Sequence, residues 1–118
     1  MLDIHTTEHD SHVVVRPVGE LDAYTVPSFR ESLAGLTAAE RLLIDLSEVP
    51  FMDSAGLGAL IGGIRRVREA GGEVTVACSR PALTRLLHTT GFDRIVVVAD
   101  TPAAALDALL GDGADPGD

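Results

Sequence analysis

The sequence predicts an α/β domain built on a mixed, mostly parallel β-sheet with about four helices. Short apolar segments rich in valine, isoleucine and leucine alternate with longer stretches in which apolar residues recur at helical spacing. Glycine or proline stands at most of the junctions between them. The first two apolar segments follow each other across a short polar loop, whereas the later ones are separated by helices. The sheet is therefore expected to begin with an antiparallel pair and to continue through parallel crossovers.

The first half of the domain contains three expected strands and one expected helix. Residues 2–7 and 13–18 read as strands, and the polar residues between them indicate a hairpin. A helix is expected over residues 27–36, where a proline occupies the first turn and the apolar side chains share one face. Residues 42–46 form the next expected strand, which leads into the most informative part of the chain.

The second half repeats the alternation. An amphipathic helix is expected from residue 55 to about residue 70, where two consecutive glycines end it. The remaining elements are a strand at 73–78, a helix at 81–89, a strand at 95–98 and a closing helix at 102–110. Residues 1–110 are thus one domain. Residues 111–118 contain only glycine, aspartate, alanine and proline, which predicts a disordered acidic tail.

Composition limits the possible partners and location. The net charge is −9, which argues against nucleic acid or an anionic membrane as a partner. Aromatic residues make up only 3% of the chain, so the core must be aliphatic. The single cysteine, Cys78, lies in an apolar strand and is interpreted as a small core residue. With no targeting signal and no membrane-length apolar segment, we expect a soluble, cytoplasmic protein.

Ser54 is the candidate functional residue. It stands where a strand ends and the long helix begins, within the segment Phe-Met-Asp-Ser-Ala-Gly-Leu-Gly at 51–58. The free N–H groups and positive dipole of a helix N-terminus favour an anion, so Ser54 is a plausible acceptor of a phosphoryl group. Serine is also a common helix N-cap, worth about 1 kcal/mol over alanine. Both interpretations stay open, and they are compatible.

Two acidic residues are expected near this serine. Glu20 and Asp22 follow the second strand, and Ser54 follows the third. Since the carboxyl ends of neighbouring parallel strands meet at one edge of a sheet, these residues are expected at the same edge. The alternative is that the two carboxylates belong to a solvated loop without a further role.

Glycines inside the long helix also require an explanation. Gly58 and Gly62 are four residues apart, so they share one face, and each costs about 1 kcal/mol relative to alanine in a helix. One explanation is a flat surface that lets a partner approach closely. The other is internal packing against a neighbouring element. Sequence does not decide between them. Arg65, Arg66 and Arg68 near the end of this helix are expected to be solvated, and the alternative is that one of them faces a partner.

The sequence does not match the catalytic, ATP-binding or metal-binding motifs that its serine and histidines bring to mind. Met52 occupies the first glycine position of the Gly-x-Ser-x-Gly nucleophile motif, and the chain has no P-loop with which to bind ATP. His5, His9 and His12 have helical spacings but fall in a strand and a turn, which does not suit a metal site. His88 is expected near a helix C-terminus, where it interacts with the dipole. We therefore expect neither an enzyme nor a metal or other cofactor.

Several segments resemble one known family. These are Gly-Glu-Leu-Asp at 19–22, Leu-Ile-Asp-Leu at 43–46, Phe-Met-Asp-Ser with Gly-Leu-Gly at 51–58, and the glycine pair at 71–72. Together they resemble the STAS-domain family of anti-sigma-factor antagonists, and the chain is expected to form a single STAS-like domain. Ala55 departs from the pattern, because many members carry a second serine or threonine there. Ser54 is consequently the only hydroxyl residue in the motif.

The resemblance implies a partner-switching protein. In that family the unphosphorylated antagonist binds an anti-sigma factor that is also a serine kinase, which frees a sigma factor. The kinase then phosphorylates the antagonist serine, here Ser54, and binding ends until a serine phosphatase resets it. The expected partner-binding residues are Glu20, Asp22, Asp53, Ala55, Gly56, Leu57, Gly58 and Gly62. Nothing in the sequence demands a dimer, so the free protein is expected to be a monomer.

Two alternatives remain beside this function. The chain could be a STAS domain that serves as a binding subunit of another assembly, such as a lipid-transport complex, with Ser54 only a helix N-cap. The other alternative is a small serine-dependent enzyme, which the failed nucleophile motif disfavours.

Overall fold

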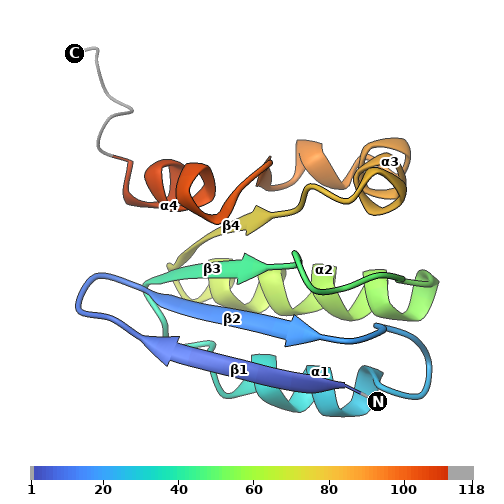
Figure 1. The fold of residues 1–118 in the computed structure, drawn as a ribbon. Helices are drawn as coiled ribbons and strands as arrows, with labels where there is room; N and C mark the ends of the chain where they lie inside the picture. Colours follow the sequence, from blue (N-terminus) through green and yellow to red (C-terminus); the bar gives the residue numbers. More distant parts are fainter. Residues whose placement is uncertain (1, 112–118) are drawn as a thin grey trace.

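The computed structural model describes residues 2–111 of the chain and contains one mixed five-stranded sheet (Figure 1). The strands are β1 (Asp3–Glu8), β2 (Val13–Val18), β3 (Arg41–Asp45), β4 (Glu73–Ala77) and β5 (Val97–Ala99). Their spatial order is the order of the sequence. β1 pairs with β2 in antiparallel register, and the other three pairings are parallel. The predicted hairpin and crossover topology are confirmed.

Helices connect the parallel strands, as the alternation of patterns predicted. They are α1 (Val26–Ala34), α2 (Ser54–Glu69) and α3 (Pro81–Thr89), with a short 3₁₀ turn η1 (Phe92–Arg94) before β5, and α4 (Pro102–Leu110) follows the last strand. Proline stands in the first turn of α1, α3 and α4, where a missing N–H is harmless. Each predicted helix is present within two or three residues of its expected bounds.

The two faces of the sheet are covered by different helices. On β3, Leu42 and Ile44 join the large core made with α1, α2 and α3, whereas Leu43 points to the other face. There Leu43 packs with Ala105 and Leu109 of α4. The alternation of side chains along a strand therefore divides one apolar run between two layers. Both cores are largely aliphatic, as the composition required, and Cys78 is buried in the larger one.

The last strand begins later in the sequence than predicted. The apolar run at 95–98 was interpreted as a strand, but β5 covers Val97–Ala99 and η1 precedes it. Gly91 takes a left-handed conformation with φ of 79°, and the fully buried Phe92 draws the following turn into the core. The N–H of Val96 donates to the carbonyl of Phe92, which continues the turn into the apolar run. This turn delays the start of the strand.

Of the acidic tail predicted at residues 111–118, the structure describes only residue 111. Gly111 caps α4 in a left-handed conformation with φ of 68°. The remainder of the predicted acidic tail, residues 112–118, lies outside the described residues.

Candidate functional site

The loops that follow β2 and β3 are hydrogen-bonded to each other. The N–H of Leu21 donates to the carbonyl of Phe51 at 3.0 Å, and the N–H of Asp53 donates to the carbonyl of Leu21 at 3.1 Å. Leu21 and Met52 form an isolated parallel bridge between these bonds. This pairing extends the sheet past the ends of its strands. It brings the loop at 19–22 directly beside the residues that precede Ser54, as the carboxyl-edge argument predicted.

Asp53, not Ser54, caps the N-terminus of α2. Its backbone is extended, and its Oδ1 accepts from the N–H of Gly56 at 2.9 Å. Its Oδ2 accepts from the N–H of Ala23 in the neighbouring loop at 3.2 Å. The N-cap interpretation of Ser54 is therefore wrong by one position. Aspartate caps as well as serine does, and here its second oxygen also ties two loops together.

Ser54 is the first residue of α2 and is exposed to solvent. Two of the four N–H groups of the first turn bond to Asp53, since Gly56 reaches its side chain and Leu57 its carbonyl. The first two N–H groups, those of Ser54 and Ala55, are not engaged by this cap. These two N–H groups and the positive end of the helix dipole favour an anion beside the Ser54 hydroxyl.

The first turn of α2 lies against the neighbouring loop with no space between them. A Cβ atom added to Gly56 would stand 2.3 Å from the carbonyl oxygen of Leu21, so only glycine fits there. Gly56 and Leu57 are both buried, and Ala55 is half-buried. Of these three expected partner-binding residues, Gly56 and Leu57 support the site from the inside, and Ala55 reaches its surface.

The acidic residues of the site differ in their surroundings. The Oδ1 of Asp22 accepts from the N–H groups of Tyr24 and Thr25, which closes the turn before α1. The hydroxyl of Thr25 donates to the carbonyl of Glu20 at 2.8 Å. Asp22 is half-buried by this turn, whereas Glu20 is exposed. The edge around Ser54 is acidic, and its aspartates also hold the loops in shape.

The two loops beside the serine carry two exposed aromatic side chains. Tyr24 is 94% exposed, and Phe51 is 49% exposed. Tyr24 follows Ala23, which is bound to Asp53, and Phe51 lies three residues before Ser54. Neither belongs to the expected set of partner-binding residues. The signal was the scarcity of aromatics: a chain with one tyrosine and three phenylalanines carries one of each in the loops that hold Ser54.

Gly58 and Gly62 lie on the outer surface of α2. A Cβ atom added to either would meet nothing within 4 Å. Gly63 is different, because its Cβ would lie 2.4 Å from Cδ1 of Leu33, where α1 packs against α2. Internal packing thus explains Gly63 and does not explain Gly58 or Gly62.

The histidines occupy other places. The rings of His9 and His12 stack at a centroid separation of 4.6 Å in the β1–β2 turn. Partial burial, and secondly the neighbouring His9, lower the pKa of His12. His88 lies in the last turn of α3, as expected, and its Nδ1 is 2.9 Å from Oδ2 of Asp93. Within residues 2–111, no group of three or more potential ligands is arranged around a metal position.

None of the helices within residues 2–111 has the length and apolar character that a membrane crossing requires.

Comparisons with known proteins find similar sequences. A family model described as STAS domain matches residues 3–105. The anti-sigma-B factor antagonist of Listeria monocytogenes is 34% identical over 100 residues, which cover 82% of this chain and 88% of that protein. The anti-sigma F factor antagonist of Paenibacillus polymyxa is 32% identical over 111 residues, which cover 92% of this chain and 95% of that protein.

Solved structures share the fold. An anti-sigma factor antagonist from Mycobacterium paratuberculosis superposes with a TM-score of 0.86 at 29% identity, covering 93% of this chain and 95% of that one. The unphosphorylated form of the anti-sigma factor antagonist SpoIIAA has a TM-score of 0.71 at 22% identity, covering 93% of this chain and 100% of that one. At that identity, the second comparison establishes the fold alone.

Proposed function

The chain belongs to the STAS-domain family, and we propose that it acts as an anti-sigma-factor antagonist. The unphosphorylated protein binds an anti-sigma factor that is also a serine kinase, and so releases a sigma factor. Phosphorylation of Ser54 by that kinase ends binding, and a serine phosphatase restores it. The chain is a binding protein rather than an enzyme, and the exchange takes place in the cytoplasm.

The observation that carries this proposal is the position of Ser54. Its side chain is exposed, and Asp53 has taken over the capping of α2. A phosphate on the hydroxyl would face the N–H groups of Ser54 and Ala55 and the positive end of the helix. The fold can therefore accept the phosphate without losing a structural contact of the serine.

Phosphorylation would act on the interface. A phosphate adds about −1.5 to −2 charge. It would join an edge that already carries Glu20, Asp22 and Asp53, and it would have to be desolvated when a partner covers it. A loss of roughly 3–4 kcal/mol from repulsion, bulk and desolvation weakens binding a few hundredfold.

The surface around Ser54 supports the same proposal. We expect the anti-sigma factor to contact the accessible members of the predicted set and the two aromatic rings: Glu20, Asp22, Asp53, Ala55, Gly58, Gly62, Tyr24 and Phe51. Large exposed aromatics are the residues that most often anchor protein interfaces. Gly56 and Leu57 would contribute by holding the first turn of α2 against the loop.

The test is affinity capture from a lysate of the source organism with three baits: the unmodified chain, Ser54→Ala and Ser54→Asp. The proposal expects an anti-sigma factor with a serine-kinase domain, identified by mass spectrometry, on the first two baits and not on the third. After purification, that protein is incubated with MgATP and each bait. It should phosphorylate the unmodified chain at Ser54 and leave Ser54→Ala unlabelled.

Other outcomes would contradict the proposal. Equal capture by all three baits would remove Ser54 from the interaction. Capture of membrane-transport subunits in place of an anti-sigma factor would favour the alternative in which this STAS domain is a binding subunit of another assembly.

A further inference from the structure

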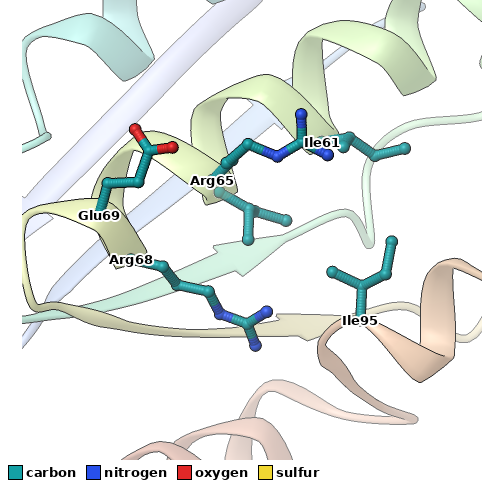
Figure 2. Close-up of a pocket in the computed structure, with 6 residues that line it drawn as sticks. Ile61, Arg65, Arg68, Glu69 and Ile95 are labelled. Atoms are coloured by element: carbon teal, nitrogen blue, oxygen red, sulfur yellow. The ribbon is translucent and has the colours of Figure 1, made fainter.

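A pocket lies along the outer side of α2, away from Ser54. Its volume is about 240 Å³, and Figure 2 shows Ile61 and Ile95 on either side of its opening. The lining residues are Ile61, Ile64, Arg65, Arg68, Glu69 and Ile95. Ile64 is buried, Ile61 is half-buried, and Ile95 is 42% exposed although it is a large aliphatic residue. The fold leaves this apolar surface uncovered.

The mouth of the pocket is basic on an acidic molecule. Arg65 and Arg68 are exposed and extend along the pocket, with Glu69 beside them (Figure 2). Within residues 2–111 the structure contains one salt bridge, between His88 and Asp93, so neither arginine is paired with a carboxylate there. The whole chain carries a net charge of −9. Two unpaired guanidinium groups next to uncovered isoleucines therefore fit an acidic and aliphatic ligand.

The pocket and the Ser54 site lie on the same face of α2. Ser54, Gly58, Gly62 and Arg65 follow one another at intervals of four, four and three residues, so they share one face of α2, and Ile61 lies beside Gly62 on that face. Neither glycine places a side chain between the two ends of this row. A partner bound at Ser54 can lie flat along α2 as far as the pocket.

We propose that the pocket is a second contact for the anti-sigma factor, which inserts an aliphatic side chain between Ile61 and Ile95 and places a carboxylate against Arg65 and Arg68. This inference rests on the proposed function and adds a defined partner chemistry to it. The edge at Ser54 is acidic and the pocket is basic, so the partner surface is basic at one end and acidic at the other. The two ends fix the orientation in which the partner binds.

The second contact is independent of phosphorylation. Ser54 and Arg65 are separated by about 16 Å along the helix axis at 1.5 Å per residue. This exceeds the Debye length of about 8 Å at physiological salt, so a charge at Ser54 is screened at the pocket. Changes at the pocket should therefore weaken the unphosphorylated and the phosphate-mimicking forms by the same factor.

The experiment uses the anti-sigma factor captured in the three-bait assay, purified, with dissociation constants measured by calorimetry. The pocket variants are Ile95→Ala and the double variant Arg65→Gln/Arg68→Gln, each alone and combined with Ser54→Asp. Arg16→Gln is the matched control, since strand alternation places Arg16 of β2 on the face of the sheet away from α2. Circular dichroism verifies that each variant is folded.

We expect each pocket variant to lower affinity about tenfold in both Ser54 backgrounds, and the control to change it less than about twofold. The effect of the double variant should shrink as salt is raised, whereas that of Ile95→Ala should persist. Affinities within twofold of the unmodified chain for both pocket variants would overturn this inference and leave the proposed function intact. Failure to capture any anti-sigma factor would instead overturn the proposed function, and this inference with it.

Discussion

At the scale of single residues, Asp53 determines how Ser54 is presented. Its two carboxylate oxygens accept from Gly56 in its own helix and from Ala23 in the neighbouring loop. The serine that follows is left with an exposed hydroxyl. Structural support is thus provided by Asp53, and the proposed phosphorylation would fall on the adjacent Ser54.

This division predicts different costs for two alanine substitutions. Asp53→Ala should lower the free energy of unfolding by about 1–2 kcal/mol, because it removes the cap of α2 and the link to the neighbouring loop. Ser54→Ala should change it by less than about 0.5 kcal/mol, as is usual for an exposed position without such a contact. Urea unfolding of both variants measures the difference. Equal costs for the two would mean that the serine is the cap.

Sequence alone placed this cap one residue too late for a specific reason. Aspartate and serine cap helices about equally well, and both stand immediately before the helical pattern. The choice depends on backbone geometry: Asp53 is extended with ψ of −174°, and its Oδ1 reaches the N–H of Gly56. The motif singles out Ser54 as the candidate for modification, but it does not reveal which neighbouring residue caps the helix.

Tyr24 offers a second residue-level prediction. Tyr24→Ala should leave the melting temperature unchanged within about 1–2 °C, because the side chain is 94% exposed and packs against little of the fold. The same substitution should weaken binding to the anti-sigma factor about tenfold or more, since an exposed aromatic in an interface loop is a typical hot spot. Calorimetric titration gives the affinity, with Tyr24→Phe as the control that keeps the ring. Unchanged affinity for Tyr24→Ala would place the ring outside the interface.

At the scale of elements, α2 combines two kinds of glycine. Gly56 and Gly63 lie where a Cβ atom would collide with Leu21 or Leu33, and they allow the loop and α1 to approach. Gly58 is exposed and Gly62 is half-buried, and an added methyl group at either would touch nothing in the molecule. The second pair weakens the helix without improving its packing.

Alanine substitutions at Gly58 and Gly56 should therefore have opposite effects on stability. Gly58→Ala should raise the free energy of unfolding by up to about 1 kcal/mol through helix propensity. Gly56→Ala should lower it, because the loop at Leu21 must move to admit the methyl group. Thermal unfolding gives both values. If Gly58 serves close approach, the stabilised Gly58→Ala variant will also bind the anti-sigma factor more weakly, and undiminished binding would contradict that role.

The order of elements was predictable because the periodicity of apolar residues and the positions of glycine and proline indicated the same boundaries over most of the chain. The hairpin, the parallel crossovers and the carboxyl-edge position of Ser54 all follow from the spacing of apolar residues and from glycine and proline at the junctions. The strand at 95–98 was misplaced because the turn after Gly91 depends on burial of Phe92. Local pattern contains no information about that tertiary contact. For the same reason the pocket beside Ile95 could not be anticipated.

At the scale of the whole molecule, charge is distributed unevenly along one face. The chain is strongly acidic, and the edge around Ser54 carries Glu20, Asp22 and Asp53. At the other end of α2, Arg65 and Arg68 stand exposed beside the pocket. A surface with opposite charges at its two ends accepts a partner in one orientation and disfavours the reverse. The proposed phosphorylation of Ser54 would deepen the negative end and leave the positive end unchanged.

The final prediction separates the fold from the switch. Ser54→Asp should keep the free energy of unfolding within about 1 kcal/mol of the unmodified chain, because a carboxylate at the first turn gains from the helix dipole what it loses by repulsion from Asp53. The same variant should lose most of its affinity for the anti-sigma factor. Urea unfolding and calorimetric titration on one preparation measure both quantities.

These two measurements identify where the phosphate acts. If affinity falls while stability holds, the charge acts at the interface, since the first turn of α2 keeps its cap and its contact with Leu21. If stability collapses together with affinity, the signal works by unfolding the edge of the sheet. The inference that the fold accepts a charge at the exposed Ser54 would then be wrong. The structure favours the first result, because no contact that holds the loops together involves the serine side chain within residues 2–111.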